Sequence, residues 1–227
     1  DLMKKYRALG IPMAVAFTKI DIMPKENIPL AAAQFAEKYG AIAYESYEAM
    51  LADESIDVIT VATPSCFHKE NAIAALDAGK HVVLEKPMAL NPIQVQQMID
   101  CAQENGVFLM EAMWTRFQPC VQKLMQIIQA GVIGNVRHVF GEFSWYAGAY
   151  DPASRLFDPA LAGGALLDIG VYGLNFALMH FGADIERIET SVQMTPTGVD
   201  GNESITIFYK DGRMAVLTHG IYSRSDR

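Results

Sequence analysis

Short apolar runs alternate with longer segments of helical periodicity between residue 31 and about residue 130. The runs are rich in Val, Ile and Leu and have the length of buried strands. We expect the first run, residues 56–62, to be buried on both faces except at Asp57 and Thr60. One intervening segment opens with Asn91 and Pro92, residue types favoured at the start of a helix. Strands that alternate with helices of about 12 residues form right-handed βαβ units around a parallel sheet. We therefore predict a doubly wound α/β fold here, with strands at residues 56–62, 81–84 and 107–110.

The periodicity changes after Gly134. Residues 136–145 alternate in hydrophobicity, which favours a long antiparallel strand, and residues 165–181 have the pattern of a strongly apolar helix. Three more strand patterns follow, and Asp211-Gly212 predicts a hairpin turn between the last two. Strands grouped around one helix indicate an α+β domain with a mostly antiparallel sheet. We expect the boundary between the two parts near residue 112.

The composition excludes several classes of protein. The chain has 227 residues and a net charge of −8, so it lacks the basic excess that nucleic-acid binding requires. The most apolar stretch, residues 165–179, contains Asp168 and Asn175 and predicts no membrane-spanning helix. Three separated cysteines without metal-ligand spacing, and the absence of a signal-peptide pattern, indicate a reduced, cytoplasmic protein with no metal site.

Residues that can carry chemistry follow each predicted strand. Thr63, Pro64, Ser65 and His68 follow the first strand, Glu85, Lys86 and Pro87 the second, and Trp114 and Arg116 the third. Ligands of open α/β sheets bind beyond the carboxyl ends of the strands, where the N–H groups of a helix start can hold a ribose or a phosphate. We therefore interpret these residues as a ligand site. The alternative is a set of ordinary turns, with Ser65 capping a helix and Lys86 in solvent.

Asp168 and Tyr172 lie four residues apart, so a helix places both side chains on one face. A carboxylate on an otherwise apolar helix is costly to bury without a partner or a purpose. A tyrosine near a lysine and a carboxylate is a plausible proton donor, because a neighbouring ammonium favours the phenolate. The alternative is that Asp168 is a helix-start carboxylate and Tyr172 an ordinary core residue.

The order of these motifs resembles that of one enzyme family. The motifs are Thr63-Pro64 with His68, Ala78-Gly79-Lys80-His81-Val82, Glu85-Lys86-Pro87, Glu111-Ala112-Met113-Trp114-Thr115-Arg116 and Gly163-Gly164 with Asp168-Ile169-Gly170-Val171-Tyr172. Together they look like the Gfo/Idh/MocA family of NAD(P)-dependent oxidoreductases, over about residues 31–220. The last two motifs most resemble the branch that contains trans-1,2-dihydrobenzene-1,2-diol dehydrogenase and D-xylose dehydrogenase.

The resemblance implies a Rossmann-like dinucleotide-binding domain at residues 1–112 and an α+β substrate and oligomerisation domain at residues 113–227. It implies NAD or NADP as cofactor, a sugar or a cyclic diol as substrate, and a homo-oligomer, a dimer or tetramer, formed through the antiparallel sheet. Lys86 would lie beside the nicotinamide ribose, and the Lys86–Pro87 peptide would be cis. Asp168 would orient the substrate, and Tyr172 would be the general acid/base, assisted by Lys86. The cofactor-binding residues would be Thr63, Pro64, Ser65, His68, Glu85, Lys86, Pro87, Trp114 and Arg116.

Two features differ from the family pattern. Family members open with a strand and a G-x-G-x-x-G/A turn that seats the pyrophosphate, and this sequence contains no such turn. Residues 13–17 could be the family's second strand, and the chain ends before the family's closing strands. We therefore expect both domains to be incomplete at the outer ends of the chain. The alternative function is a non-catalytic binding or regulatory protein on the same scaffold, with a degenerate cofactor site.

Overall fold

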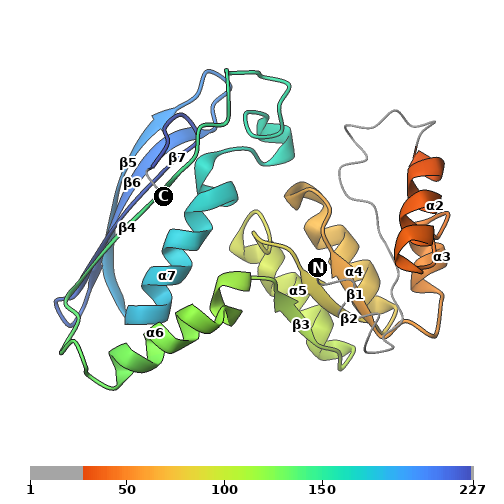
Figure 1. Cartoon of the computed structure of the whole chain (residues 1–227), viewed down its shortest axis with the longest axis horizontal. Helices are drawn as coiled ribbons and strands as arrows, with labels where there is room; N and C mark the ends of the chain where they lie inside the picture. Colours follow the sequence, from red (N-terminus) through yellow and green to blue (C-terminus); the bar gives the residue numbers. More distant parts are fainter. Residues whose placement is uncertain (1–27, 226–227) are drawn as a thin grey trace. The chain divides into compact units, whose positions relative to one another are not determined.

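The computed structural model describes residues 28–225 of the chain (Figure 1). The chain divides into two compact units, with the division between Ala112 and Met113. The strand predicted at residues 13–17 lies outside the described residues.

The first unit contains a three-stranded parallel sheet in the order β1-β2-β3. Its strands are β1 (Val58–Val61), β2 (His81–Leu84) and β3 (Leu109–Glu111). Its helices are α2 (Ile28–Tyr39), α3 (Tyr47–Leu51), α4 (His68–Asp77) and α5 (Pro92–Glu104), with a 3-10 turn at Ser65–Phe67. The parallel pairing and the alternation of strands with helices confirm the predicted α/β fold class.

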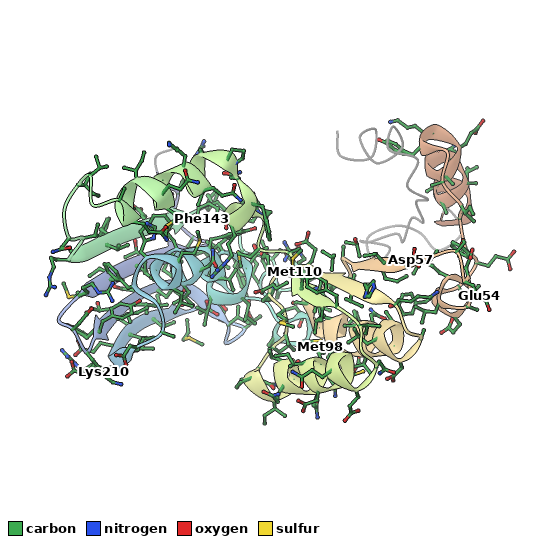
Figure 2. All side chains as sticks on the ribbon, turned by 90° about the horizontal axis from the view of Figure 1, so that it is seen from below. Glu54, Asp57, Met98, Met110, Phe143 and Lys210 are labelled. Atoms are coloured by element: carbon green, nitrogen blue, oxygen red, sulfur yellow. The ribbon has the colours of Figure 1, made fainter. Side chains whose placement is uncertain are left out.

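The core of the first unit lies between the sheet and helices α4 and α5. Met98 of α5, labelled in Figure 2, is fully buried in this core. The predicted start of α5 is confirmed, because the Asn91 side chain accepts a hydrogen bond from the Gln94 N–H at 3.0 Å. The predicted burial of residues 56–62 is wrong at Val58, which is 53% exposed, whereas Ile59 and Val61 are buried as expected.

The second unit contains a four-stranded mixed sheet in the order β4-β7-β6-β5. Its strands are β4 (His138–Ser144), β5 (Ile185–Met194), β6 (Asp200–Tyr209) and β7 (Met214–Gly220). As predicted, β6 pairs antiparallel with both β5 and β7. However, β4 pairs parallel with β7, so the antiparallel direction predicted for residues 136–145 is wrong. Alternation of side chains shows which face of a strand is buried, but it carries no information about the direction of the neighbouring strand.

A π-helical turn interrupts the helix predicted at residues 165–181. The turn spans Leu166–Gly170 and leads directly into α7 (Val171–Phe181). The other helical elements of this unit are α6 (Pro119–Gln129) and 3-10 turns at Trp114–Phe117 and Pro159–Leu161. Single π turns inside helices are frequent at functional sites. The segment with the predicted acid–base residues is therefore not a regular helix.

The stretch Pro159–Phe181 contains 23 residues and is long and apolar enough, by length and composition alone, to cross a membrane. In the structure its α7 part packs against β4 and β7. It also carries Asp168 in an ion pair and the buried Asn175. Because a core helix can be as apolar as a membrane span, we interpret this segment as the core helix of the second unit.

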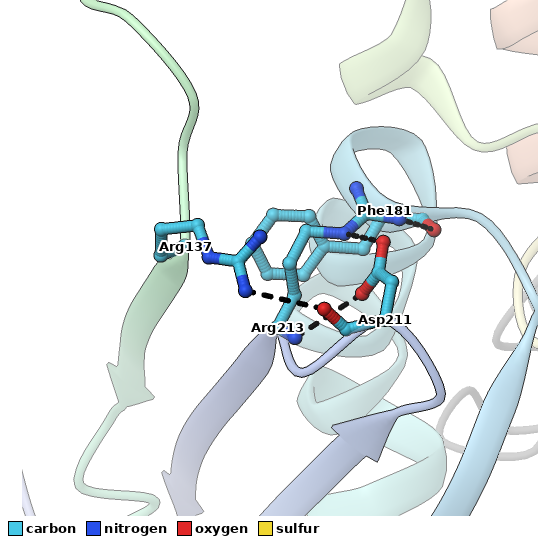
Figure 3. A network of polar contacts seen from close by, with 4 residues as sticks. All are labelled: Arg137, Phe181, Asp211 and Arg213. Atoms are coloured by element: carbon cyan, nitrogen blue, oxygen red, sulfur yellow. Dashed lines mark hydrogen bonds and ion pairs between the residues drawn. The ribbon is translucent and has the colours of Figure 1, made fainter.

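A network of polar contacts fixes the turn between β6 and β7 (Figure 3). Arg213 donates through Nε to Asp211 Oδ2 at 2.6 Å and through Nη2 to the Phe181 carbonyl at 3.1 Å. Arg137, which precedes β4, donates to the Asp211 carbonyl at 3.1 Å. Gly212 adopts a φ of +80°, a left-handed conformation that glycine adopts at little cost. The turn predicted at Asp211-Gly212 thus forms and is tied to the end of α7.

Candidate functional site

The carboxyl ends of the parallel strands carry the first group of predicted site residues. His68, the first residue of α4, is 1% exposed. Its Nδ1 lies 2.8 Å from the carbonyl of Pro87, and its Nε2 lies 2.9 Å from the carbonyl of Thr63. One side chain therefore joins the loop after β1 to the loop after β2. The structure brings together three of the residues that the sequence analysis assigned to cofactor binding.

Both ring nitrogens of His68 face backbone carbonyls, which can only accept hydrogen bonds. Because both nitrogens contact these carbonyls and the ring is buried, the His68 side chain holds the backbones of the two strand-end loops together. The Thr63 hydroxyl accepts a hydrogen bond from Asn71 Nδ2 at 3.1 Å, which leaves its own proton to donate. Pro64 occupies the cap position of the 3-10 turn that begins at Ser65, and no side chain caps that turn. The interpretation of Ser65 as a helix cap is therefore wrong.

The second loop contains Glu85, Lys86 and Pro87. The Lys86–Pro87 peptide is cis, as the family resemblance implies. The Glu85 carboxylate accepts a hydrogen bond from the Lys86 N–H at 3.2 Å. Glu111, at the end of β3, accepts one from the Met88 N–H at 2.8 Å. The loop after β2 is therefore held by His68 on one side and by the neighbouring strand on the other.

In the second unit, Tyr172 of α7 lies between two aromatic rings. Trp114 donates a hydrogen bond through Nε1 to the Tyr172 hydroxyl oxygen at 3.0 Å. The ring centroids of Trp114 and Phe143 lie 6.0 and 5.8 Å from that of Tyr172, and both rings meet it edge-on. Phe143, on β4, is labelled in Figure 2. An indole donor on a phenol oxygen stabilises the deprotonated phenol, which is the form that a general base requires.

Arg116, two residues after Trp114, contacts the next turn of α7. Its Nε donates to Asn175 Oδ1 at 2.5 Å, and the Asn175 amide lies 3.4 Å from the Thr115 hydroxyl. Asn175 is buried and was not singled out by the sequence analysis. An asparagine in an otherwise apolar helix was a sequence signal for a buried hydrogen bond, but the sequence does not identify Arg116 as the donor. Trp114 and Arg116 therefore fasten the 3-10 turn Trp114–Phe117 to the helix that carries Tyr172.

Asp168 lies in the π turn and pairs with an arginine from the preceding loop. Arg155 Nη1 is 3.2 Å from Asp168 Oδ1, and the two side chains are 52% and 17% exposed. Arg155 is not among the site residues predicted from the sequence. The ion pair gives the carboxylate a fixed direction near the solvent boundary.

The amino end of the helical segment is capped from the sheet. Asp200, at the start of β6, accepts a hydrogen bond from the Leu166 N–H at 2.5 Å. Gly164 lies against this carboxylate with a φ of +118°, so a side chain there would be excluded by both conformation and space. The Gly163-Gly164 pair of the motif thus has a physical reason. In the described residues, no cluster of three or more His, Cys, Asp or Glu side chains could hold a metal ion.

A parallel α/β unit with polar residues at the carboxyl ends of its strands is typical of dinucleotide-binding domains. Residues 26–113 match the model of the oxidoreductase family with an NAD-binding Rossmann fold. Residues 121–227 match the model of the GFO/IDH/MocA C-terminal domain. The chain belongs to the Gfo/Idh/MocA family, as the order of its motifs predicts.

Relatives with named activities are similar to most of this chain. It is 39% identical over 189 residues to trans-1,2-dihydrobenzene-1,2-diol dehydrogenase of Danio rerio, which covers 82% of this chain and 56% of the relative. It is 36% identical over 200 residues to scyllo-inositol 2-dehydrogenase (NADP(+)) IolU of Bacillus subtilis, covering 86% of this chain and 60% of that protein. The chain therefore spans little more than half the length of these relatives.

Two solved structures show the same fold. The first is KijD10, a 3-ketoreductase from Actinomadura kijaniata in complex with NADP and TDP-benzene. It has a TM-score of 0.78 at 30% identity, over 85% of this chain and 59% of that chain. The second is an aldose-aldose oxidoreductase from Caulobacter crescentus complexed with glycerol, with a TM-score of 0.80 at 27% identity. That match covers 87% of this chain and 62% of the other.

Proposed function

We propose that the protein is an oxidoreductase that moves a hydride between a nicotinamide cofactor and a carbinol or carbonyl carbon of a sugar or cyclic diol. Family membership supports the cofactor class, and the relatives named above are dehydrogenases and reductases. In this proposal Tyr172 gives and takes the substrate proton. Asp168 orients the substrate hydroxyl, and assistance from Lys86 stays a prediction.

The observation that carries this proposal is the hydrogen bond from Trp114 to the Tyr172 oxygen. When Tyr172 gives up its proton to a substrate oxygen, negative charge develops on the phenol oxygen, and the indole N–H stabilises it. The flanking rings of Trp114 and Phe143 limit the directions in which the ring can turn. Such a held tyrosine is prepared for proton transfer, which requires the two oxygens within hydrogen-bond reach.

The strand-end residues fit the nicotinamide and ribose end of a dinucleotide. Thr63 has a hydroxyl proton to donate, and Lys86 supplies an ammonium next to a rigid turn. A hydroxyl and an ammonium can both donate hydrogen bonds to ribose hydroxyls and phosphate oxygens. When bound, the nicotinamide supplies the hydride chemistry, and the protein supplies orientation and proton transfer.

We also propose that a second copy of the chain covers the open face of the mixed sheet. The cross-strand pairs Phe140 with Val216 and Phe208 with Met214 place apolar side chains on the face opposite α7. Phe140 is 65% exposed, and contiguous apolar surface of this kind marks interaction sites. Val216→Glu is expected to dissociate the oligomer, as measured by light scattering during gel filtration. An unchanged mass would contradict this assembly.

The experiment that tests the proposed activity compares two tyrosine variants of the full-length protein. Tyr172→Phe is expected to lower kcat about 100-fold or more, because the proton donor is lost and the ring is kept. Tyr146→Phe is the matched control, since Tyr146 is a 57% exposed tyrosine of the same unit. Substrates are trans-dihydrodiols, D-xylose and scyllo-inositol, with cofactor affinity measured by NADH and NADPH fluorescence. A protein that binds neither cofactor would favour the non-catalytic alternative.

A further inference from the structure

Glu203 and His219 form a buried polar pair beneath the helical segment. They are cross-strand neighbours on β6 and β7, and His219 Nδ1 lies 2.9 Å from Glu203 Oε1. The Glu203 and His219 side chains are 4% and 0% exposed. Removing such groups from water is unfavourable, and apolar residues of similar size often stabilise a core as well or better. The pair therefore points to a role other than stability.

Two glycines of the helical segment lie directly against this pair. A Cβ atom at Gly170 would stand less than 3.0 Å from Glu203 Oε1, and one at Gly173 less than 3.0 Å from His219 Nε2. Gly170 ends the π turn, and Gly173 directly follows Tyr172. The pair thus touches the backbone on both sides of the proposed acid–base residue. No side chain larger than hydrogen fits at either position without a shift of the helix or the pair.

The outer edge of the His219 ring has no polar partner. Within the described part of the chain, Nε2 is buried and makes no hydrogen bond. Since the carboxylate can only accept, Nδ1–H donates to Glu203, and Nε2 faces the backbone at Gly173. A buried nitrogen without a partner is unfavourable. The position of His219 Nε2 is therefore explained by its contact with the helix and not by a hydrogen bond.

We propose that Glu203 and His219 are positioning residues for Tyr172. Glu203 fixes the orientation of the imidazole, and the imidazole sets the height of the backbone at Gly173 above the sheet. This height determines whether the Tyr172 hydroxyl meets the Trp114 indole. The inference rests on the proposed function, in which Tyr172 transfers the proton. Neither residue touches the substrate in this account.

His219→Asn is the most informative variant. Asparagine places a nitrogen near the position of Nδ1, so it still donates to Glu203, but it lacks the ring edge that faces Gly173. We expect kcat to fall about 10- to 100-fold with KM changed by less than about threefold, because a small misplacement of a reacting group has effects of this size. His138→Asn is the control, since His138 is an exposed histidine on β4.

Gly173→Ala tests the same contact from the helix side. Alone, the added methyl group collides with His219 and is expected to lower kcat to a similar degree. In the His219→Asn background the space left by the ring accepts the methyl group, so the double variant is expected to be more active than the Gly173→Ala single variant. Additive losses would overturn the proposed contact. Glu203→Gln keeps an acceptor for Nδ1–H and is expected to retain most of the activity.

A spectroscopic readout separates this inference from the proposed function. The chain contains two tryptophans, so the Trp114 indole N–H resonance is assigned by its loss in Trp114→Phe. We expect His219→Asn to move this resonance in the same direction as Tyr172→Phe does, and His138→Asn to leave it unchanged. An unmoved resonance together with full kcat in a folded His219→Asn protein would overturn the positioning role. Full activity of Tyr172→Phe would instead overturn the proposed function, and the resonance would still report the contact.

Discussion

Replacement of His68 by leucine tests how the strand-end loops are held. Leucine has a similar volume and keeps the apolar packing, but it removes the contacts of the two ring nitrogens with the carbonyls of Thr63 and Pro87, to one of which a neutral imidazole donates a hydrogen bond. Each buried carbonyl left without a partner costs about 1–3 kcal/mol. Thr63 is only half-buried, so water partly replaces its partner, whereas Pro87 is buried. Because the ring donates one hydrogen bond, the expected loss in the free energy of unfolding is about 1–3 kcal/mol.

The assay is urea and thermal unfolding followed by circular dichroism. For a unit of about 100 residues, this loss corresponds to a decrease in Tm of about 5 °C or more. His81→Leu is the matched control, because His81 is exposed and makes one hydrogen bond, from the Phe108 N–H at 2.9 Å. Water replaces that bond, so the control is expected to lose less than about 1 kcal/mol. Equal stabilities of the two variants would refute the role assigned to His68.

Burial raises the pKa of Tyr47 from 10.0 to about 12, so the stability that depends on its neutral form is complete below pH 10 and is lost as the pH rises through about 12. Alkaline unfolding of Tyr47→Phe is therefore expected to lack that loss, and parallel curves would contradict it. Burial and a hydrogen bond to Asp77 raise the pKa of the Cys101 thiol to about 11, which lowers the fraction of reactive thiolate. Iodoacetamide is therefore expected to modify the exposed Cys120 before Cys101, as measured by mass spectrometry of peptides. Asp200→Ala removes the cap of the π turn and is expected to cost about 1 kcal/mol in urea unfolding, whereas no change would exclude the cap.

The sequence predicted those parts of the fold that depend on local patterns. Asn91 and Pro92 identified the start of α5, and the run at 81–84 matched β2 residue for residue, because cap chemistry and hydrophobic runs are local. The parallel pairing of β4 with β7 was not predictable, since a strand pattern is the same for both directions. The π turn was also missed, because it depends on contacts with β6 and β7.

The candidate site residues come from residue types and motif order. Lys86, Asp168 and Tyr172 were selected from motif order and family resemblance, and their catalytic roles stay predictions. Other residues of the site were missed, because folding alone brings them to their partners. Arg155 pairs with Asp168, Asn175 pairs with Arg116, and the Glu203–His219 pair lies against the helical segment that carries Tyr172. His68 was assigned to the cofactor, whereas its buried ring contacts two backbone carbonyls. Chemistry at a position is readable from residue type, but the partner of a side chain is not.

Transfer of deuterium from C4-deuterated NADH or NADPH tests the central claim most directly. We expect the full-length protein to place the label on the carbinol carbon formed from a sugar ketone or diol-derived ketone. We expect Tyr172→Phe to bind the cofactor with nearly unchanged affinity. Its rate of label transfer is expected to be lower than that of the wild-type protein by a factor of about 100 or more. Transfer at the wild-type rate by Tyr172→Phe, or no transfer by the wild-type protein, would contradict the account.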